Sequence, residues 1–369
     1  MISNSPSVPT TTDRNFMAAS TNFEDSVACL SWGQDENPNV LLCSTWDGFV
    51  YLYHVRTQQQ GEIEIVSNIE ETYSKSMVIP CISLDWQHSA KKIIAGSIDG
   101  TIFSMDTNAS EVQTIGKHDD AVKGVYYLEE RNQVCSLSYD KTVKFWDMRS
   151  PEPVSSFNLG EKIVCCDFRF PLMAVGLSNQ KLLFFNVNHD LPIICGALDS
   201  HYIDSPLGDN SSLSAISLSR GSMIGIASSD GRSNISSLAR DAEDVFYLED
   251  PRFTFKAHKT DPGQNGNTSD STILYPIHAA GFHPTCPFSY TYFTAGGDGC
   301  VNIWNRREKK KLAFWTCENA PITAAKYSPN GKLLAYAYGY DYAKGIEGSK
   351  TIKPKLHIHS TQANEVSEF

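Results

Sequence analysis

The chain lacks several signatures that would point to a common class of function. Its ten cysteines include no Cys-x-x-Cys pair, which argues against a zinc or dithiol redox site. No stretch is long and apolar enough to span a membrane. Residues 1–13 are rich in Ser, Thr, Asn and Pro and lack the apolar core of a signal peptide. We therefore expect an intracellular protein with reduced cysteines, no membrane insertion and a disordered tail over residues 1–13.

Positive charge and ligand-binding motifs are also scarce. The formal net charge of -11 argues against nucleic-acid binding by bulk charge and leaves room only for a local basic face. The segment Gly296-Gly297-Asp298-Gly299 lacks the helix and the lysine of a phosphate-binding loop. His357 and His359 alternate on one predicted strand, but two ligands alone are a weak metal signal, and a surface strand end explains them better. We predict no cofactor and no metal site.

What the chain does contain is one short unit repeated along its length. Residues 133–147 form two alternating strands joined by a turn at residues 139–142, with Trp146-Asp147 at the end of the second strand. Asp99 and Asp140, the turn residues of two successive units, are 41 positions apart, within the roughly 40–45-residue period of WD-repeat blades. Variants of the unit recur at residues 46–53, 98–103, 179–185, 229–232 and 297–305.

This repeat predicts an all-β, seven-bladed WD-repeat β-propeller in a single domain over residues 14–360, with a short C-terminal tail over residues 361–369. Residues 14–19, which include Phe16 and Met17, precede the first blade. We expect them to supply the outer strand of the last blade and so to close the ring. Two of the longer gaps between units hold insertions, a polar loop at 260–272 and residues 189–212, and long loops on a rigid scaffold are common binding sites.

Two sets of residues could be mistaken for a catalytic triad. The first comprises His118, Ser138, Asp140 and Trp146, and the second comprises His258, Asp298 and Trp304. Recurrence in separate blades favours a structural network, in which a His, a strand hydroxyl, the turn Asp and the later Trp hydrogen-bond and hold the blade loops. Since no other cluster of Cys, His and carboxylates stands apart from this scaffold, we predict that the protein is not an enzyme.

Two surface features are candidates for binding. Residues 306–311 (Arg-Arg-Glu-Lys-Lys-Lys) place five basic side chains in six positions after the Trp304 strand. This segment is either a solvated turn or a rim that binds RNA phosphates or an acidic partner. Aromatic residues near the blade tips could pack against the apolar side of a partner, although Tyr139 could equally be a closed turn residue. These aromatic residues are Trp46, Tyr139, Tyr340 and Tyr342.

Longer stretches resemble one particular group of propellers. The matching segments are residues 138–151, 253–259, 275–277, 282–284 and 295–299. They are similar to the messenger-RNA export propellers that bind nucleoporins through the GLEBS peptide, and to the related spindle-checkpoint propellers of the budding-uninhibited-by-benzimidazole family. Residues 340–345 look like the Tyr-Asp-Trp…Gly-His element of the export branch, which the checkpoint branch lacks. The resemblance covers roughly residues 16–359 and is thin between 189 and 238.

The resemblance implies a non-enzymatic adaptor in the nucleus, at the nuclear pore and envelope rim, with some protein in the cytoplasm. It implies a monomeric propeller in a heteromeric complex. Members of the family hold an acidic GLEBS hairpin across one face, where two Arg residues pair with its carboxylates. Arg232 matches the first of these residues. The second falls at Ser212, after the matching residues 205–207, so the chain departs from the family there.

The family's nucleic-acid patch aligns with the basic segment, and this favours RNA as its ligand over a merely solvated turn. The aligned residues are Arg306, Arg307, Lys309, Lys310 and Lys311. The alternative within binding proteins is a spindle-assembly-checkpoint adaptor that binds the GLEBS peptides of checkpoint kinases. An enzyme that uses the propeller cavity is disfavoured because no catalytic set stands apart from the blade scaffold.

Overall fold

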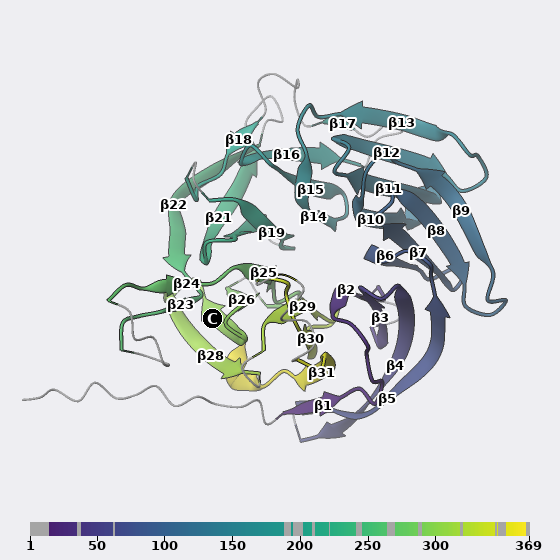
Figure 1. Ribbon diagram of the computed structural model, residues 1–369. Helices are drawn as coiled ribbons and strands as arrows, with labels where there is room; N and C mark the ends of the chain where they lie inside the picture. The colour runs from purple at the N-terminus through teal and green to yellow at the C-terminus, as the bar shows by residue number, and fades with distance from the viewer. Residues whose placement is uncertain are drawn as a thin grey trace, which may run out of the picture.

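Seven antiparallel β-sheets stand in a ring around a central channel (Figure 1). The computed structural model describes residues 15–34, 38–61, 63–187, 193–194, 202–208, 211–220, 222–240, 246–263, 270–286, 290–317, 320–343, 345 and 352–366. The all-β, seven-bladed propeller predicted from the sequence is confirmed. The predicted tail over residues 1–13 lies outside the described residues, as does much of the 189–212 loop.

Each blade runs from an inner strand at the channel to an outer strand at the rim. The inner strands are β2 (Val27–Trp32), β6 (Cys81–Gln87), β10 (Val122–Leu128), β14 (Ile163–Arg169), β19 (Leu213–Leu218), β25 (Ile277–Phe282) and β29 (Ile322–Tyr327). The second strands are β3 (Val40–Thr45), β7 (Lys92–Ser97), β11 (Gln133–Ser138), β15 (Leu172–Leu177), β20 (Met223–Ser228), β26 (Thr291–Gly296) and β30 (Leu333–Tyr338).

The third and outer strands complete the blades. The third strands are β4 (Phe49–Gln60), β8 (Thr101–Asp106), β12 (Thr142–Asp147), β16 (Lys181–Asn186), β21 (Arg232–Arg240), β27 (Cys300–Asn305) and β31 (Lys355–Ser360). The outer strands are β5 (Ile63–Ser76), β9 (Val112–Lys117), β13 (Pro153–Asn158), β17 (Ile193–Ile194), β22 (Phe246–Lys256), β28 (Lys310–Thr316) and β1 (Phe16–Ala18).

A few short elements are not part of the four-stranded pattern of the blades. The strand β18 (Ile203–Asp204) also pairs with β16, and β23 (Lys259–Thr260) pairs with β24 (Ile273–Leu274). Two 3-10 turns are described, η1 (Glu129–Arg131) and η4 (Ala363–Glu365). Within the described ranges, no helix has the length and hydropathy needed to cross a membrane.

The hydrophobic core is divided into layers that lie between neighbouring blades. One layer joins Ile94 and Ile102 of the second blade to Val125, Val134 and Trp146 of the third. The second strands are therefore covered on both faces, and all six residues of β3, β26 and β30 are buried. The sequences of strands buried on both faces are nearly continuous apolar runs and do not alternate between apolar and polar residues. A single blade cannot bury both of its faces, so the fold depends on a complete ring.

The ring closes as predicted, through β1 in the last blade. This sheet has the order β1-β31-β30-β29, and Phe16 lies opposite His359 in its register. Two segments from opposite ends of the propeller thus share one blade, which leaves no unpaired gap in the ring.

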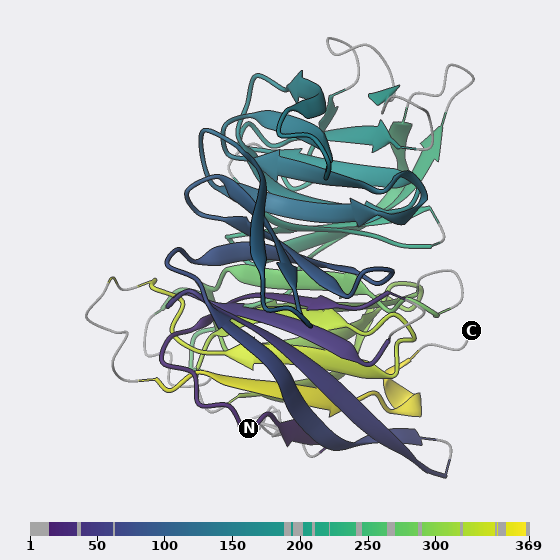
Figure 2. The same cartoon turned by 90° about the vertical axis from the view of Figure 1, so that its right-hand side faces the viewer.

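A long hairpin of the first blade reinforces this closure, and the sequence patterns did not predict it. The strands β4 and β5 are 12 and 14 residues long and extend past the neighbouring strands (Figure 2). Val66 and Ile69 of this hairpin pack in one cluster with Leu356 and Ile358 of β31. The backbone N–H of Val66 also donates to Ser360 Oγ at 3.2 Å.

The expectation of a surface strand end at His357 and His359 is wrong, because both side chains are buried. The Phe16 ring of β1 stacks on His357 at 4.1 Å between centroids. His359 stacks on Trp315 at 4.4 Å, and its Nε2 lies 2.8 Å from Glu365 Oε2 in η4. The strand is covered by β1 and Trp315, which are distant from it in sequence, and by the adjacent η4.

Candidate functional site

One face of the ring is formed by the turns between the second and third strands, and we call it the turn face. Successive turns of an antiparallel sheet alternate ends, so these turns all lie at the same end of the channel. In every blade, the first residue of the turn donates its backbone N–H to the segment that enters that blade, at 2.9–3.1 Å. The residues that donate this hydrogen bond are therefore equivalent in the seven blades, and we call their place in the turn the turn-start position. It is occupied by Trp46, Ile98, Tyr139, Ser178, Ser229, Gly297 and Gly339.

In the third blade a four-residue network holds the turn aspartate. His118 Nδ1 lies 2.8 Å from Asp140 Oδ2, and His118 Nε2 lies 2.7 Å from Ser136 Oγ. Trp146 Nε1 donates to the same Ser136 hydroxyl at 2.7 Å. Burial opposes ionisation of Asp140, but hydrogen bonds from His118 and Thr142 outweigh it and hold the pKa of this carboxyl well below its usual value.

The hydroxyl of this network comes from Ser136 and not from Ser138, which corrects the sequence-based assignment. Ser138 Oγ instead donates to the Asp120 carbonyl at 2.8 Å and accepts the Asp140 N–H at 3.0 Å. The two serines point to the same side of β11 because side chains alternate along a strand. Only Ser136 lies where the Trp146 indole reaches it.

The sixth blade repeats the network with a threonine. His258 Nδ1 lies 2.7 Å from Asp298 Oδ1, and Thr294 Oγ1 joins His258 Nε2 at 2.9 Å and Trp304 Nε1 at 3.0 Å. Burial opposes ionisation of Asp298, but the charge and hydrogen bond of His258 prevail and lower its pKa. Ser136 and Thr294 were not predicted, although both stand four residues before the turn Asp. That spacing is the signal that would have found them.

Arg232 lies on the turn face, as the first residue of β21. Its side chain is 42% exposed, and its Nε lies 3.2 Å from Asp230 Oδ2. One guanidinium nitrogen lies 3.5 Å from the Leu207 carbonyl, within the segment that resembles the family before Ser212. Ser212 itself is exposed and accepts the Ser229 N–H at 2.9 Å through its carbonyl. The fold therefore brings both segments of the predicted arginine site together around Arg232.

The four predicted aromatic residues all fall on the turn face, but they differ in exposure. Trp46 and Tyr342 are exposed, and Tyr139 is partly exposed. Tyr340 is buried and differs from the expectation: its hydroxyl donates to the Gly345 carbonyl at 2.6 Å. Its ring packs behind Tyr342 at 5.1 Å between centroids. Tyr340 can support the surface, whereas Tyr342 can be contacted from solvent.

The basic segment, residues 306–311, lies at the opposite end of its blade. Residues 306–309 form the turn between β27 and β28, and Lys310 and Lys311 begin β28, while the Asp298 turn precedes β27. Consecutive turns lie at opposite ends of an antiparallel sheet. The candidate peptide residues and the candidate RNA residues therefore occupy different faces of the ring.

Three of the five basic side chains, those of Arg307, Lys309 and Lys311, lie over aromatic rings at the surface. Lys309 Nζ is 5.9 Å from the Phe253 ring, and Lys311 Nζ is 5.2 Å from the Trp304 ring. Phe255 connects these rings, at 4.6 Å from each centroid. Burial lowers the pKa of Lys311, as it does that of Arg306, which donates to Ser237 Oγ at 3.3 Å. Arg307 lies over Tyr290, and Lys310 pairs with Glu308.

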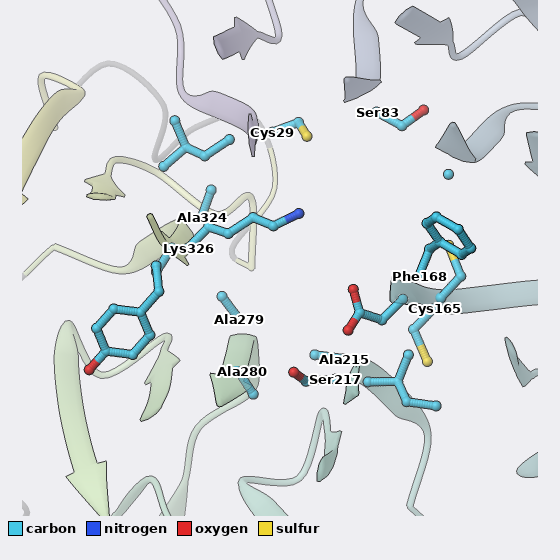
Figure 3. A pocket seen from close by; sticks show the side chains of 18 of the residues that line it. Cys29, Ser83, Cys165, Phe168, Ala215, Ser217, Ala279, Ala280, Ala324 and Lys326 are labelled. Atoms are coloured by element: carbon cyan, nitrogen blue, oxygen red, sulfur yellow. The ribbon is translucent and has the colours of Figure 1, made fainter. Parts of the chain in front are cut away.

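The central channel holds a cavity of about 330 Å³, lined by the inner strands, into which Lys326 points (Figure 3). Carboxylates on the inner strands connect neighbouring blades. Asp85 accepts the N–H of Tyr127 at 2.7 Å, and Asp167 accepts that of Leu218 at 2.7 Å. Burial raises the pKa of Asp85 to about 6. Among the described residues, no group of three or more His, Cys, Asp or Glu side chains is arranged to hold a metal ion.

Comparison with known proteins agrees with the repeat. Residues 109–147 match the family described as "WD domain, G-beta repeat". The solved structure of the RRP9 WD40 repeats superposes with a TM-score of 0.67 at 14% identity, covering 96% of this chain and 99% of that one. At this identity the likeness concerns the fold alone.

Curated relatives are similar over nearly the whole chain. Protein Rae1 of Drosophila melanogaster is 28% identical over 350 residues, which cover 91% of each chain. The Poly(A)+ RNA export protein of Schizosaccharomyces pombe is 26% identical, over 93% of this chain and 90% of that protein. The mRNA export factor GLE2 of Chaetomium thermophilum is 26% identical, over 93% and 89% respectively. Together with the WD-repeat match, these similarities support the messenger-RNA export family of WD-repeat propellers as the family that this chain resembles.

Proposed function

We propose that this protein is a non-enzymatic adaptor in the nuclear export of messenger RNA, acting in the nucleus and at the nuclear pore and envelope rim, with some protein in the cytoplasm. Relatives named as messenger-RNA export factors, similar over about nine-tenths of the chain, support this role. The propeller is a rigid platform with two usable faces, and the two sets of candidate contacts lie on opposite faces. A heteromeric complex can then form without the ligands excluding each other.

A GLEBS-type peptide is the proposed ligand of the turn face. The observation that carries this proposal is the exposed guanidinium of Arg232 beside the Asp230 carboxylate. An ion pair in this partly exposed setting contributes little to stability, so an acidic side chain of the peptide can join or replace it at low cost. Trp46, Tyr139 and Tyr342 offer apolar surface on the same face, and Tyr340 supports Tyr342 from behind.

RNA is the proposed ligand of the basic rim, which consists of Arg306, Arg307, Lys309, Lys310 and Lys311. Cationic side chains that lie over Phe253 and Trp304 can combine phosphate contacts with apolar surface. Proteins that bind single-stranded nucleic acid commonly combine these two contributions. The acidic remainder of the chain limits binding to this local patch.

The peptide proposal is tested by Arg232→Glu. We expect about a tenfold to hundredfold loss of affinity for a nucleoporin GLEBS peptide in calorimetry, since a charge-assisted contact becomes a repulsion. Arg149→Glu is the matched control, because Arg149 also pairs with an Asp two residues earlier but lies at the opposite end of its blade. Equal losses in the two variants would overturn the assignment. Tighter binding of GLEBS peptides from checkpoint kinases would favour the checkpoint alternative.

The RNA proposal is tested by reversing two charges, Arg307→Glu with Lys309→Glu. Filter binding to single-stranded RNA should weaken by about tenfold or more, and the dependence of the affinity on salt should become shallower because fewer counterions are released. Lys91→Glu with Lys92→Glu is the control at a turn of the second blade, and Lys91 shares the left-handed backbone of Lys309. An unchanged salt dependence in the rim variant would contradict the proposal.

A further inference from the structure

The turn-start position divides the turn face into two halves. In the first three blades it carries the large apolar side chains of Trp46, Ile98 and Tyr139, whereas the other four blades have only Ser or Gly there. Trp46 is 42% exposed and Ile98 is 39% exposed. Because the same backbone hydrogen bond forms in all seven blades, turn geometry does not require a large side chain at this position.

A fourth exposed apolar residue lies in a segment that is hydrogen-bonded to two of these turns. Val78 is 101% exposed and lies in the connection from the first blade to the second. On one side of it, the Met77 N–H donates to the Gly48 carbonyl at 2.7 Å. On the other side, the Pro80 carbonyl accepts the Ile98 N–H at 3.1 Å. We call Trp46, Val78, Ile98 and Tyr139, which lie on the turn-face segments of three successive blades, the apolar arc, and exposed apolar side chains grouped in this way mark interaction sites.

Acidic side chains border the apolar arc. They are Glu24, Asp25, Asp47, Asp99, Asp119 and Asp120, each within two residues of a turn or of the carbonyl that a turn-start N–H contacts. Burial opposes ionisation of Asp99, but hydrogen bonds from Ser97 and Thr101 prevail and lower its pKa, so it is charged at neutral pH.

The nearby lysines that the structure describes pair with only two of these six carboxylates, so negative charge remains in excess. Lys117 Nζ is 3.5 Å from Asp99, and Lys162 Nζ is 3.9 Å from Asp120. Lys141 Nζ donates to the Gly160 carbonyl at 3.0 Å. On the far side of the turn face the sign of the exposed charge is opposite, because the Arg232 guanidinium is exposed there.

We propose that the apolar arc docks a basic segment of a protein partner, one that places aliphatic side chains on Trp46, Val78, Ile98 and Tyr139 and Lys or Arg side chains against the bordering carboxylates. This deepens the proposed function and rests on it for the choice of face. A peptide that spans the face would lie with its acidic part at Arg232 and its basic part at the apolar arc. Complementary charge sets such an orientation and speeds association, while the buried apolar contacts supply most of the affinity.

The test uses short fluorescein-labelled peptides and the full chain, with fluorescence anisotropy as the readout. The first peptide combines leucine and lysine, the second replaces each lysine with glutamate, and the third replaces each leucine with serine. We expect only the leucine–lysine peptide to bind well. Val78→Ser with Ile98→Ser should weaken its binding by about tenfold, and Asp119→Lys should weaken it by a smaller factor.

Two control variants make the result decisive. Val154→Ser removes an apolar side chain of similar exposure from an outer strand, β13, and should leave binding unchanged. Arg232→Glu should also leave it unchanged, so a failure at Arg232 can be told apart from a failure at the apolar arc. The proposal is overturned if the glutamate peptide or the serine–lysine peptide binds as well as the leucine–lysine peptide. It is equally overturned if the Val78 and Ile98 substitutions have no more effect than Val154→Ser.

Discussion

The third blade holds its turn aspartate with an imidazole, whereas the fifth blade holds the equivalent aspartate with two serines. Asp140 lies against His118, and the Ser136 hydroxyl then links the histidine to Trp146. Asp230 instead accepts hydrogen bonds from Ser228 and from Ser211, the latter at 2.8 Å. The backbone turns are the same in both blades, as the shared N–H to carbonyl bond of the turn-start position shows.

The two arrangements differ most in how far the carboxylate is shielded from water. The Asp140 side chain is 7% exposed, while that of Asp230 is 28% exposed and reaches Arg232 on its open side. The imidazole thus seals the turn of the third blade, and its absence leaves the turn of the fifth blade accessible. The same type of turn is closed and rigid in the third blade and presents the Arg232 cation to solvent in the fifth.

The largest expected contrast between these blades comes from removing the partner of each aspartate. His118→Ala should lower the free energy of unfolding by about 3–4 kcal/mol, because it leaves Asp140 buried without its main partner. Ser211→Ala should cost only about 1 kcal/mol, because Asp230 keeps Ser228, Arg232 and contact with solvent. Urea unfolding followed by tryptophan fluorescence measures both. His54→Ala, at an exposed histidine of β4, is the control, and equal losses for His118→Ala and Ser211→Ala would remove the distinction between the blades.

A smaller difference in stability is expected within the third blade, between the Ser136 and Ser138 variants. Ser136→Ala should cost about 2 kcal/mol, since two buried groups, His118 Nε2 and Trp146 Nε1, lose their common partner. Ser138→Ala should cost about half as much, because its main loss is the acceptor of one backbone N–H. The two variants are matched in chemistry, strand and burial. A larger loss for Ser138→Ala would restore the original sequence-based assignment.

The smallest expected effect is a dependence on pH. The folded pKa of Asp140 lies below the unfolded value of about 3.9. Its contribution to stability is therefore complete above about pH 5 and is lost as the pH falls through the unfolded value toward the folded one. The stability difference between the wild type and Asp140→Asn should shrink by roughly 0.5–1 kcal/mol between about pH 6 and pH 3.5. In a His118→Ala background this pH dependence should be weaker, and an undiminished dependence there would show that His118 is not its source.

The repeated turns could be predicted because their signals are local. An Asp or Gly in a turn and alternation in the next few residues act within a single hairpin. The network hydroxyl could not be chosen in the same way. Ser136 and Ser138 lie on the same side of one strand, and only the position of the Trp146 ring distinguishes them. Tyr340, which replaces the turn Asp in the last blade, was likewise recognised as a tip residue, but its burial was not predicted.

Residue patterns alone were sufficient for the all-β propeller and for the closing strand at Phe16–Ala18, because strand alternation and turn chemistry are encoded over a few positions. Exposure and spatial grouping required the closed ring, since they depend on segments far apart in the chain. The ring covered His357 and His359 with β1 and Trp315, placed the β4–β5 hairpin over the closure, and brought Trp46, Val78, Ile98 and Tyr139 to one half of the turn face. It also separated Arg232 from the basic rim, because alternate turns of an antiparallel sheet face opposite ends.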